Sequence, residues 1–308
     1  MSRRFLLAGA QMGPIERTAT RRETVARLQA LLHRAAALGA RFVVFPELAL
    51  TTFFPRWELD PAERDAYFER EMPSAAVRPL FDDARRLGIG FYLGYAELAT
   101  GDGTARHFNT AILVGAGGEI IGKYRKVHLP GFHDPQPDRV LQHLEKRYFE
   151  PGDLGFPVFE ALGGRVGMCI CNDRRWPETY RMLALQGAEL IMLGYNTPLE
   201  YSPDPRQQQL SDFHNHLVMQ AGAYQNAAWV IGVAKAGREA GSHLIGGSAI
   251  IAPSGEIVAQ ARTVDDEIIV AECDLDAAAA YRRDMFDFRR HRRPEVYDLL
   301  TRRDPPGP

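Results

Sequence analysis

Cysteine is scarce in this sequence, which has only three, at positions 169, 171 and 273, among 308 residues. A small, odd number of cysteines argues against a disulfide framework and is typical of proteins kept in a reducing compartment. The sequence therefore predicts a cytoplasmic protein without structural disulfides.

Long apolar runs and a dominant charge are lacking too. No stretch approaches the roughly 18 uninterrupted apolar residues of a membrane span. The apolar run near the N-terminus, of about six residues, is shorter than a signal-peptide core and is predicted to be the first strand. Lys and Arg total 37 against 39 Asp and Glu, a formal net charge of −2, so no overall field favours nucleic acid or an anionic membrane. We expect neither as a partner and expect a small-molecule substrate instead.

Apolar residues are nevertheless plentiful enough for a sizeable core, since 45% of the sequence is hydrophobic. Helical periodicity and short apolar strands alternate along the chain. Residues 23–40 have the pattern of a helix that stops at Gly39, and the strand FVVF follows. The same helix-then-strand unit recurs at residues 74–98, 177–196 and 207–234.

Two segments of similar sequence, AILVGAGGEIIGKY and AIIAPSGEIVAQA, each have the pattern of a β-hairpin across a Gly-containing turn. Their similarity suggests an internal pseudo-repeat. Two similar halves, each a mixed sheet covered by helices, predict an α/β fold of the α+β type, a four-layer α-β-β-α sandwich. We expect it to be a single domain over residues 1–285.

Two segments lack this periodicity. Residues 131–155 are expected to form a long surface excursion, because loops of that length are usually functional or disordered. Residues 286–308 form a C-terminal tail rich in Arg and His. The tail is interpreted either as a solvated segment or as an inter-subunit arm, and its short charge run does not predict nucleic-acid binding.

Three motifs place a reactive side chain at the end of a predicted strand. Glu47 follows FVVF, where partial burial would raise the pKa of its carboxyl toward that of a general base. Lys126, in GKYRKVHL, could hold a positive charge over a developing oxyanion. Cys171 precedes a helix predicted to begin at Pro177, and in a strained, exposed turn with a lysine nearby its pKa would fall. Each also has an ordinary interpretation: a structural carboxylate, a basic edge strand and a packed free cysteine. Cys169, deeper on the same strand, is interpreted as packing.

Taken in order, FPEL, YRKVHL and CNDRRWPE resemble the motifs of the nitrilase superfamily of carbon–nitrogen hydrolases, and the similarity runs over almost the whole chain. The resemblance implies a catalytic triad of Glu47, Lys126 and Cys171. Within the superfamily, HLEKRYFEPGD, ICNDRRWPE and GYNTP look most like the N-carbamoyl-D-amino acid amidohydrolases. The implied reaction converts an N-carbamoyl-D-amino acid to the D-amino acid, ammonia and carbon dioxide. It passes through a carbamoyl thioester on Cys171 and needs no metal or organic cofactor.

The resemblance also implies supporting residues. Glu145 matches a second glutamate that orients the lysine, although a lone acid in a charged loop would otherwise be interpreted as a surface residue. The backbone N–H of Asn172 would help to bind the oxyanion. Arg174 or Arg175, with Arg175 favoured, would bind the substrate carboxylate, because a guanidinium can bind a carboxylate in a bidentate manner. The polar groups implied around the carbamoyl end are His128, His143 and Asn196. Members of the superfamily usually assemble as homo-oligomers, so a dimer or tetramer is expected.

Rival interpretations either keep the same triad or dispense with catalysis. An aliphatic amidase, a β-ureidopropionase or a true nitrilase would use the same three residues with a different substrate pocket. A catalytically silent metabolite-binding protein would be expected to show decay of the triad, which is intact here. His214 and His216 lie two apart in a predicted helix and would face different directions, so no metal site is predicted.

Overall fold

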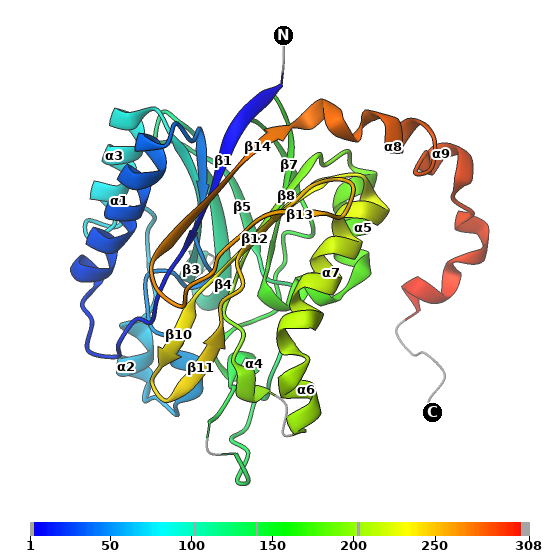
Figure 1. The fold of residues 1–308 in the computed structure, drawn as a ribbon. Helices are drawn as coiled ribbons and strands as arrows, with labels where there is room; N and C mark the ends of the chain where they lie inside the picture. The colour runs from blue at the N-terminus through cyan, green and yellow to red at the C-terminus, as the bar shows by residue number, and fades with distance from the viewer. Residues whose placement is uncertain (1–2, 102, 140, 202–203, 303–308) are drawn as a thin grey trace.

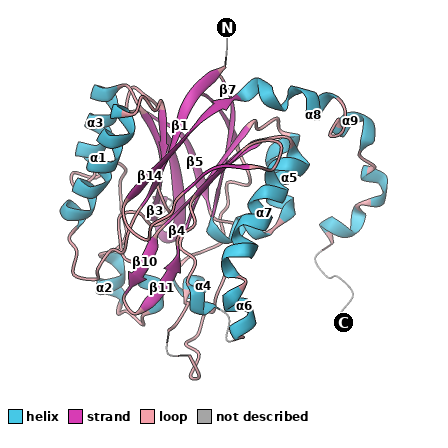
Figure 2. Ribbon diagram, in the orientation of Figure 1, coloured by secondary structure: helices cyan, strands magenta, loops and turns pink. Residues whose placement is uncertain are grey.

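The computed structural model describes residues 3–101, 103–139, 141–201 and 204–302, and in it two six-stranded sheets lie face to face between two layers of helices (Figure 1). One helix pair covers the outer face of the first sheet and another pair covers the outer face of the second (Figure 2). These four helices are α1 (Arg21–Ala37) and α3 (Arg78–Leu87) on one side, and α5 (Pro177–Leu185) and α7 (Ser211–Asn226) on the other. The predicted four-layer α-β-β-α sandwich is confirmed.

The first sheet has a parallel centre and antiparallel edges. Strands β1, β2 and β3 run parallel, β4 and β5 extend the sheet beyond β3, and β14 pairs with β1 in the antiparallel sense. The predicted N-terminal strand is β1. In spatial order the strands are β14 (Glu267–Asp274), β1 (Arg4–Gln11), β2 (Phe42–Val44), β3 (Gly90–Gly101), β4 (Thr104–Val114) and β5 (Ile120–Arg125).

The second sheet repeats this plan, which confirms the predicted pseudo-repeat. Strands β7, β8 and β9 run parallel, and the hairpin β12–β13 extends the sheet beyond β9 as β4–β5 does beyond β3. The two segments of similar sequence form the hairpins β4–β5 and β12–β13. In spatial order the strands are β13 (Ile257–Gln260), β12 (Ala249–Ile251), β9 (Trp229–Ala234), β8 (Leu190–Tyr195), β7 (Gly164–Ile170) and β6 (Val158–Ala161). A separate two-stranded ribbon consists of β10 (Ala236–Glu239) and β11 (Ser242–Ile245).

Local sequence explains where the main helices begin and end. Thr20 and Glu23 form a capping box at the start of α1, in which each side chain accepts a hydrogen bond from the other residue's backbone N–H. α3 ends at Leu87 and is followed by Gly88, which has a φ of 66°, a conformation that glycine adopts without steric penalty. The remaining helical segments are short: η1 (Phe54–Arg56), α2 (Pro61–Asp65), α4 (Glu145–Tyr148), η2 (Cys171–Arg175), η3 (Leu199–Tyr201), α6 (Pro205–Gln209), η4 (Leu275–Ala278), α8 (Ala279–Arg283), α9 (Phe288–His291), η5 (Pro294–Val296) and η6 (Asp298–Thr301).

Apolar side chains fill three regions. Between the sheets, residues from both inner faces pack together, among them Leu7 and Tyr92 of the first sheet and Met168 and Ile231 of the second. A second cluster lies between the first sheet and α1 and α3. A third includes Leu48, which lies beyond the carboxyl end of β2, together with Phe53, Leu144, Tyr148 and Phe149.

The expectation of a surface excursion over residues 131–155 is wrong for residues 143–145 and 148–149. These residues are buried, and α4 forms part of the third apolar cluster; residue 140 lies outside the described residues. In the tail, α9, η5 and η6 lead away from the body of the protein (Figure 1), and residues 303–308 lie outside the described part. Among the described residues, no helix is both long and apolar enough to span a lipid bilayer.

Candidate active site

Glu47 lies three residues beyond β2, where its backbone is wedged between two strands. A Cβ atom at Gly94 of β3 would lie 2.7 Å from the Glu47 Cα, and one at Gly194 of β8 would lie 2.3 Å from the Glu47 N. Only glycine leaves room for this approach. The Glu47 carboxylate is completely buried and accepts hydrogen bonds from Asn109 Nδ2 at 2.8 Å and from the Asn196 backbone N at 2.9 Å.

Lys126 follows directly after β5 and is held between two buried carboxylates. Its Nζ lies 2.7 Å from Glu47 Oε1 and 2.7 Å from Glu145 Oε2. Burial alone would disfavour the ammonium, but the charges of Glu145 and Glu47 outweigh it and raise the pKa of Lys126. A permanently charged ammonium is therefore fixed in a site from which water is largely excluded.

Glu145 reaches the lysine from α4, and His143 lies behind it. The His143 Nε2 is 3.3 Å from Glu145 Oε1, and the imidazole packs on the ring of Phe53 with 5.2 Å between centroids. Burial would raise the pKa of Glu145, but Lys126 and His143 lower it, so the carboxylate stays charged. The structure thus places Glu145 in direct contact with the Lys126 ammonium.

Cys171 begins η2 directly after β7, with a φ of +46°. A positive φ is strained for any residue other than glycine, and such strain is found at functional sites more often than elsewhere. Asp173 holds the turn, because its carboxylate accepts hydrogen bonds from the Ile170 N at 3.0 Å and from the Tyr124 hydroxyl at 2.7 Å. The expected strain is present.

The expected exposure and the expected low pKa of Cys171 are wrong. Only 6% of the residue is exposed. Burial, together with the charge of Glu47, raises the pKa of the thiol to about 11, although Lys126 and Arg174 act in the opposite direction. The resting group is consequently a neutral thiol that needs a base. The neighbouring Cys169 is fully buried, as the packing interpretation expected.

The two arginines after the cysteine point to different environments. Arg174 is 1% exposed, and its guanidinium donates to Cys171 O at 2.7 Å, Asn215 Oδ1 at 3.0 Å and Thr197 Oγ1 at 2.8 Å. Arg174 therefore supports the cysteine turn and is not directed at a substrate carboxylate. Arg175, at the end of η2, is exposed.

The remaining predicted residues border the same region. Asn196 contacts both halves of the site, since its backbone O lies 4.0 Å from Cys171 Sγ while its backbone N bonds Glu47. His128 is bonded through Nδ1 to Asp173 at 2.8 Å and stacks on Trp176. The Asn172 side chain donates to His128 O at 3.0 Å.

Sequence reasoning missed three buried polar residues: Asn109, Asp173 and Asn215. Asn109 lies between Phe108 and Thr110 at the start of the buried part of β4, and a polar residue at a buried strand position is a usable signal. Asp173 lies inside the cysteine motif, but nothing in the adjacent sequence indicates that its carboxylate is buried and accepts hydrogen bonds. Asn215 lies in α7 and carries no local signal, because its partner Arg174 is distant in sequence.

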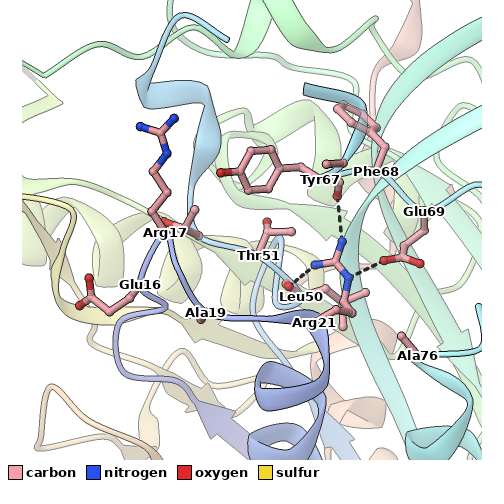
Figure 3. A pocket seen from close by; sticks show the side chains of 12 residues that line it. Glu16, Arg17, Ala19, Arg21, Leu50, Thr51, Tyr67, Phe68, Glu69 and Ala76 are labelled. Carbon is pink, nitrogen blue, oxygen red and sulfur yellow. Dashed lines mark hydrogen bonds and ion pairs between the residues drawn. The ribbon is translucent and has the colours of Figure 1, made fainter. Parts of the chain in front are cut away.

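The larger of two pockets in the described part of the chain does not include Glu47, Lys126 or Cys171 among its lining residues. It has a volume of about 350 Å³ and is bordered by Arg17, Arg21, Thr51, Tyr67 and Glu69, with Arg21 bonded to Glu69 (Figure 3). A much smaller pocket reaches His143 and is lined also by residues of the 53–56 and 139–142 segments. No cluster of three or more His, Cys, Asp or Glu residues able to hold a metal ion occurs in the described part of the chain.

Comparison with known proteins identifies the class. Residues 6–283 match the carbon-nitrogen hydrolase family, whose members hydrolyse carbon–nitrogen bonds other than peptide bonds. The N-carbamoylputrescine amidase of Arabidopsis thaliana is 32% identical over 292 residues, covering 91% of this chain and 90% of that protein. The citrullinase of Francisella tularensis is 30% identical over 290 residues, covering 91% and 93%. A carbon-nitrogen hydrolase from Helicobacter pylori G27 has a TM-score of 0.82 at 26% identity, over 98% of this chain and 99% of that one. The protein belongs to the carbon-nitrogen hydrolase family of the nitrilase superfamily.

Proposed function

We propose that this protein hydrolyses N-carbamoyl-D-amino acids to the free D-amino acid, ammonia and carbon dioxide. The observation that carries the proposal is the Lys126 ammonium held between Glu47 and Glu145 beside a buried cysteine thiol. Two relatives are named for substrates with a ureido group, which supports a carbamoyl substrate. The assignment to D-amino acids rests on the similarity of HLEKRYFEPGD, ICNDRRWPE and GYNTP to the N-carbamoyl-D-amino acid amidohydrolases.

In the proposed mechanism Glu47 accepts the thiol proton as Cys171 attacks the carbamoyl carbon. The raised pKa of the thiol explains why a base is needed. The tetrahedral oxyanion is stabilised by Lys126 and by the backbone N–H of Asn172, which lies in the first turn of η2. Glu47 then donates the proton to the departing amine, which leaves as the free amino acid.

A carbamoyl thioester remains on Cys171 after this first half-reaction. Glu47 next removes a proton from a water molecule, which attacks the thioester and releases carbamic acid while the thiol regains its proton. Carbamic acid breaks down to ammonia and carbon dioxide. These steps use only side chains and water, so the proposal includes no cofactor.

Recognition of the substrate carboxylate is assigned to Arg175. Arg174 is buried in the cysteine turn, whereas Arg175 is exposed at the end of that turn, where a substrate can reach it. A charge-assisted hydrogen bond contributes about 1.5–3 kcal/mol, or roughly 10- to 150-fold in kcat/KM. Arg175→Gln should impair N-carbamoyl-phenylalanine by this factor and leave its uncharged methyl ester nearly unaffected. Equal losses for both would contradict the assignment.

The proposal is tested by measuring ammonia and amino-acid release from both enantiomers of N-carbamoyl-phenylalanine and N-carbamoyl-methionine. We expect turnover of the D forms only, and none with Cys171→Ala. Cys169→Ala is the matched control, because it removes a second buried thiol two residues away and should retain activity. Cleavage of simple amides or nitriles, with neither enantiomer cleaved, would show that the substrate class is wrong.

We further propose a cytoplasmic homo-oligomer, a dimer or tetramer, in which residues 286–308 form an inter-subunit arm. The three cysteines are free thiols, in keeping with a reducing compartment. The tail presents Val296, Leu299 and Leu300 to solvent, each more than 60% exposed. Apolar side chains exposed in this way are typical of a surface that a partner subunit covers.

A further inference from the structure

A second buried ion pair lies outside the proposed catalytic residues. Lys235 follows β9 and Glu239 ends β10; the Lys235 Nζ lies 2.8 Å from Glu239 Oε2 and 3.1 Å from Oε1, and both side chains are completely buried. Burial lowers the pKa of Lys235, and Glu239 counteracts that shift. A buried pair of this kind is weak support for stability and is sometimes retained because it specifies one geometry.

This ion pair anchors the segment that follows Glu47. Lys235 Nζ donates to Thr51 O at 2.9 Å, and the Phe53 N donates to Glu239 Oε1 at 2.7 Å. The guanidinium of Arg56 donates to the backbone O of Glu239. Residues 51–56 are therefore held at three points.

The anchored segment also reaches the other carboxylate that binds Lys126. Pro55 O accepts a hydrogen bond from Leu144 N at 2.7 Å, and Leu144 immediately precedes Glu145. The ring of Phe53 packs against His143, whose Nε2 is paired with Glu145 at 3.3 Å. One ion pair thus supports the backbone beside Glu145 and the imidazole in contact with it.

We propose that Lys235 and Glu239 are positioning residues, which hold residues 51–56 so that Glu47 and Glu145 clasp the Lys126 ammonium in its catalytic position. The inference rests on the proposed roles of those three residues. Displacements of about 1 Å at a distance from the reacting atoms can reduce rates by about 100-fold. Loss of the pair should accordingly lower kcat more than it raises KM.

The main test uses Glu239→Gln and Lys235→Met. Each removes one charge of the pair and touches no proposed catalytic residue. Activity is normalised to folded, active-site-titrated enzyme, well below the melting temperature. We expect kcat to fall at least tenfold with KM changed less than about threefold. An unchanged kcat in both variants would overturn the proposal.

Glu189→Gln is the matched control for a stability effect alone. Glu189 pairs with Arg3 and accepts a backbone hydrogen bond from Arg165 N at 3.1 Å, but it precedes β8, at the end of the strands away from the site. This variant should melt at a lower temperature while keeping the wild-type kcat. A fall in kcat equal to that of Glu239→Gln would show that general destabilisation explains both results.

Further variants and a substrate-free assay keep the proposal testable if a single variant does not fold or if the substrate is different. If the single variants do not fold, Lys235→Met/Glu239→Gln removes both charges together. Phe53→Leu removes the ring contact while retaining the ion pair, and an unchanged kcat in this variant would overturn the proposed link to His143.

The pH dependence of Cys171 modification by methyl methanethiosulfonate gives a readout without any substrate. It should differ from wild type in Glu239→Gln and not in Glu189→Gln. Should wild type cleave a different amide, the proposed substrate fails, and the same variants are compared on that amide.

Discussion

Replacing Glu47 should make the cysteine more reactive toward a simple thiol reagent while abolishing catalysis. The thiol pKa of about 11 is raised first by burial and next by the charge of Glu47, from an ordinary value of 9.0. Glu47→Gln removes that charge and leaves Lys126 and Arg174 to favour the thiolate. The pKa of Cys171 should therefore fall in the variant, although the base that accepts its proton is gone.

The magnitude follows from the size of the shift. A rise of about two pKa units reduces the thiolate fraction near pH 8 about 100-fold. The more basic thiolate is intrinsically about 6- to 10-fold more nucleophilic, since the Brønsted coefficient is about 0.4–0.5. The wild-type thiol should thus react roughly tenfold more slowly near pH 8 than a thiol with the ordinary pKa. Each pKa unit recovered in Glu47→Gln should speed modification about threefold, while turnover falls by at least 100-fold through the loss of general-base catalysis.

The assay is modification by methyl methanethiosulfonate between pH 6 and 11.5, followed by peptide mass spectrometry. This reagent contains no amide and so does not mimic a substrate. The wild-type rate should keep rising beyond pH 9, and the variant curve should lie at lower pH. A wild-type plateau at or below pH 9, or slower modification of Glu47→Gln, would refute the reasoning that Cys171 rests as a neutral thiol beside a charged carboxylate.

Three further predictions concern neighbouring features of the structure. Glu145→Gln should lower kcat at least tenfold. The pKa of Glu145 is lowered from 4.5 in the folded protein, so its contribution to stability is present above pH 4.5 and is lost as the pH falls through the folded pKa. The melting temperatures of wild type and variant should therefore converge in acid. Gly194→Ala should lower the free energy of unfolding by about 1–3 kcal/mol and abolish activity, because the new methyl group would lie 2.3 Å from the Glu47 backbone N. Gly101→Ala is the control: the space at its Cβ position is open, so this variant should melt and react as wild type does. Truncation after Met285 should reduce the native mass measured by light scattering, and an unchanged mass would contradict the inter-subunit arm.

Local patterns in the sequence were sufficient to locate the strands that precede Glu47, Lys126 and Cys171. The apolar run before Glu47 and the one before Cys171 each predicted a buried strand, and the polar residue at its end followed from that. The duplicated hairpins predicted the two-sheet arrangement. Such features depend on residues close in sequence, so periodicity and turn chemistry reveal them.

Features that depend on distant partners were not predictable in this way. Arg174 and Arg175 are adjacent and chemically identical, yet only the first meets Asn215 of α7 and Thr197 after β8. Residues 143–149 carry charges and lack periodicity, but residues 143–145 and 148–149 are buried because they pack against Lys126 and the third apolar cluster. The thiol pKa was predicted with the wrong sign because the degree of burial is a tertiary property.

The pseudo-repeat explains why the proposed catalytic groups meet at all. In the first half, β1, α1 and β2 lead to Glu47; in the second, β7, α5 and β8 lead to Asn196. These two residues are bonded directly across the sheet interface, from Asn196 N to Glu47 Oε2 at 2.9 Å and from Asn196 Nδ2 to Glu47 O at 3.0 Å. The base therefore belongs to one half and is oriented by a residue of the other, while Cys171 follows β7, the strand next to β8. Neither half alone contains both Glu47 and Cys171, so the site can form only when the two sheets have packed against each other.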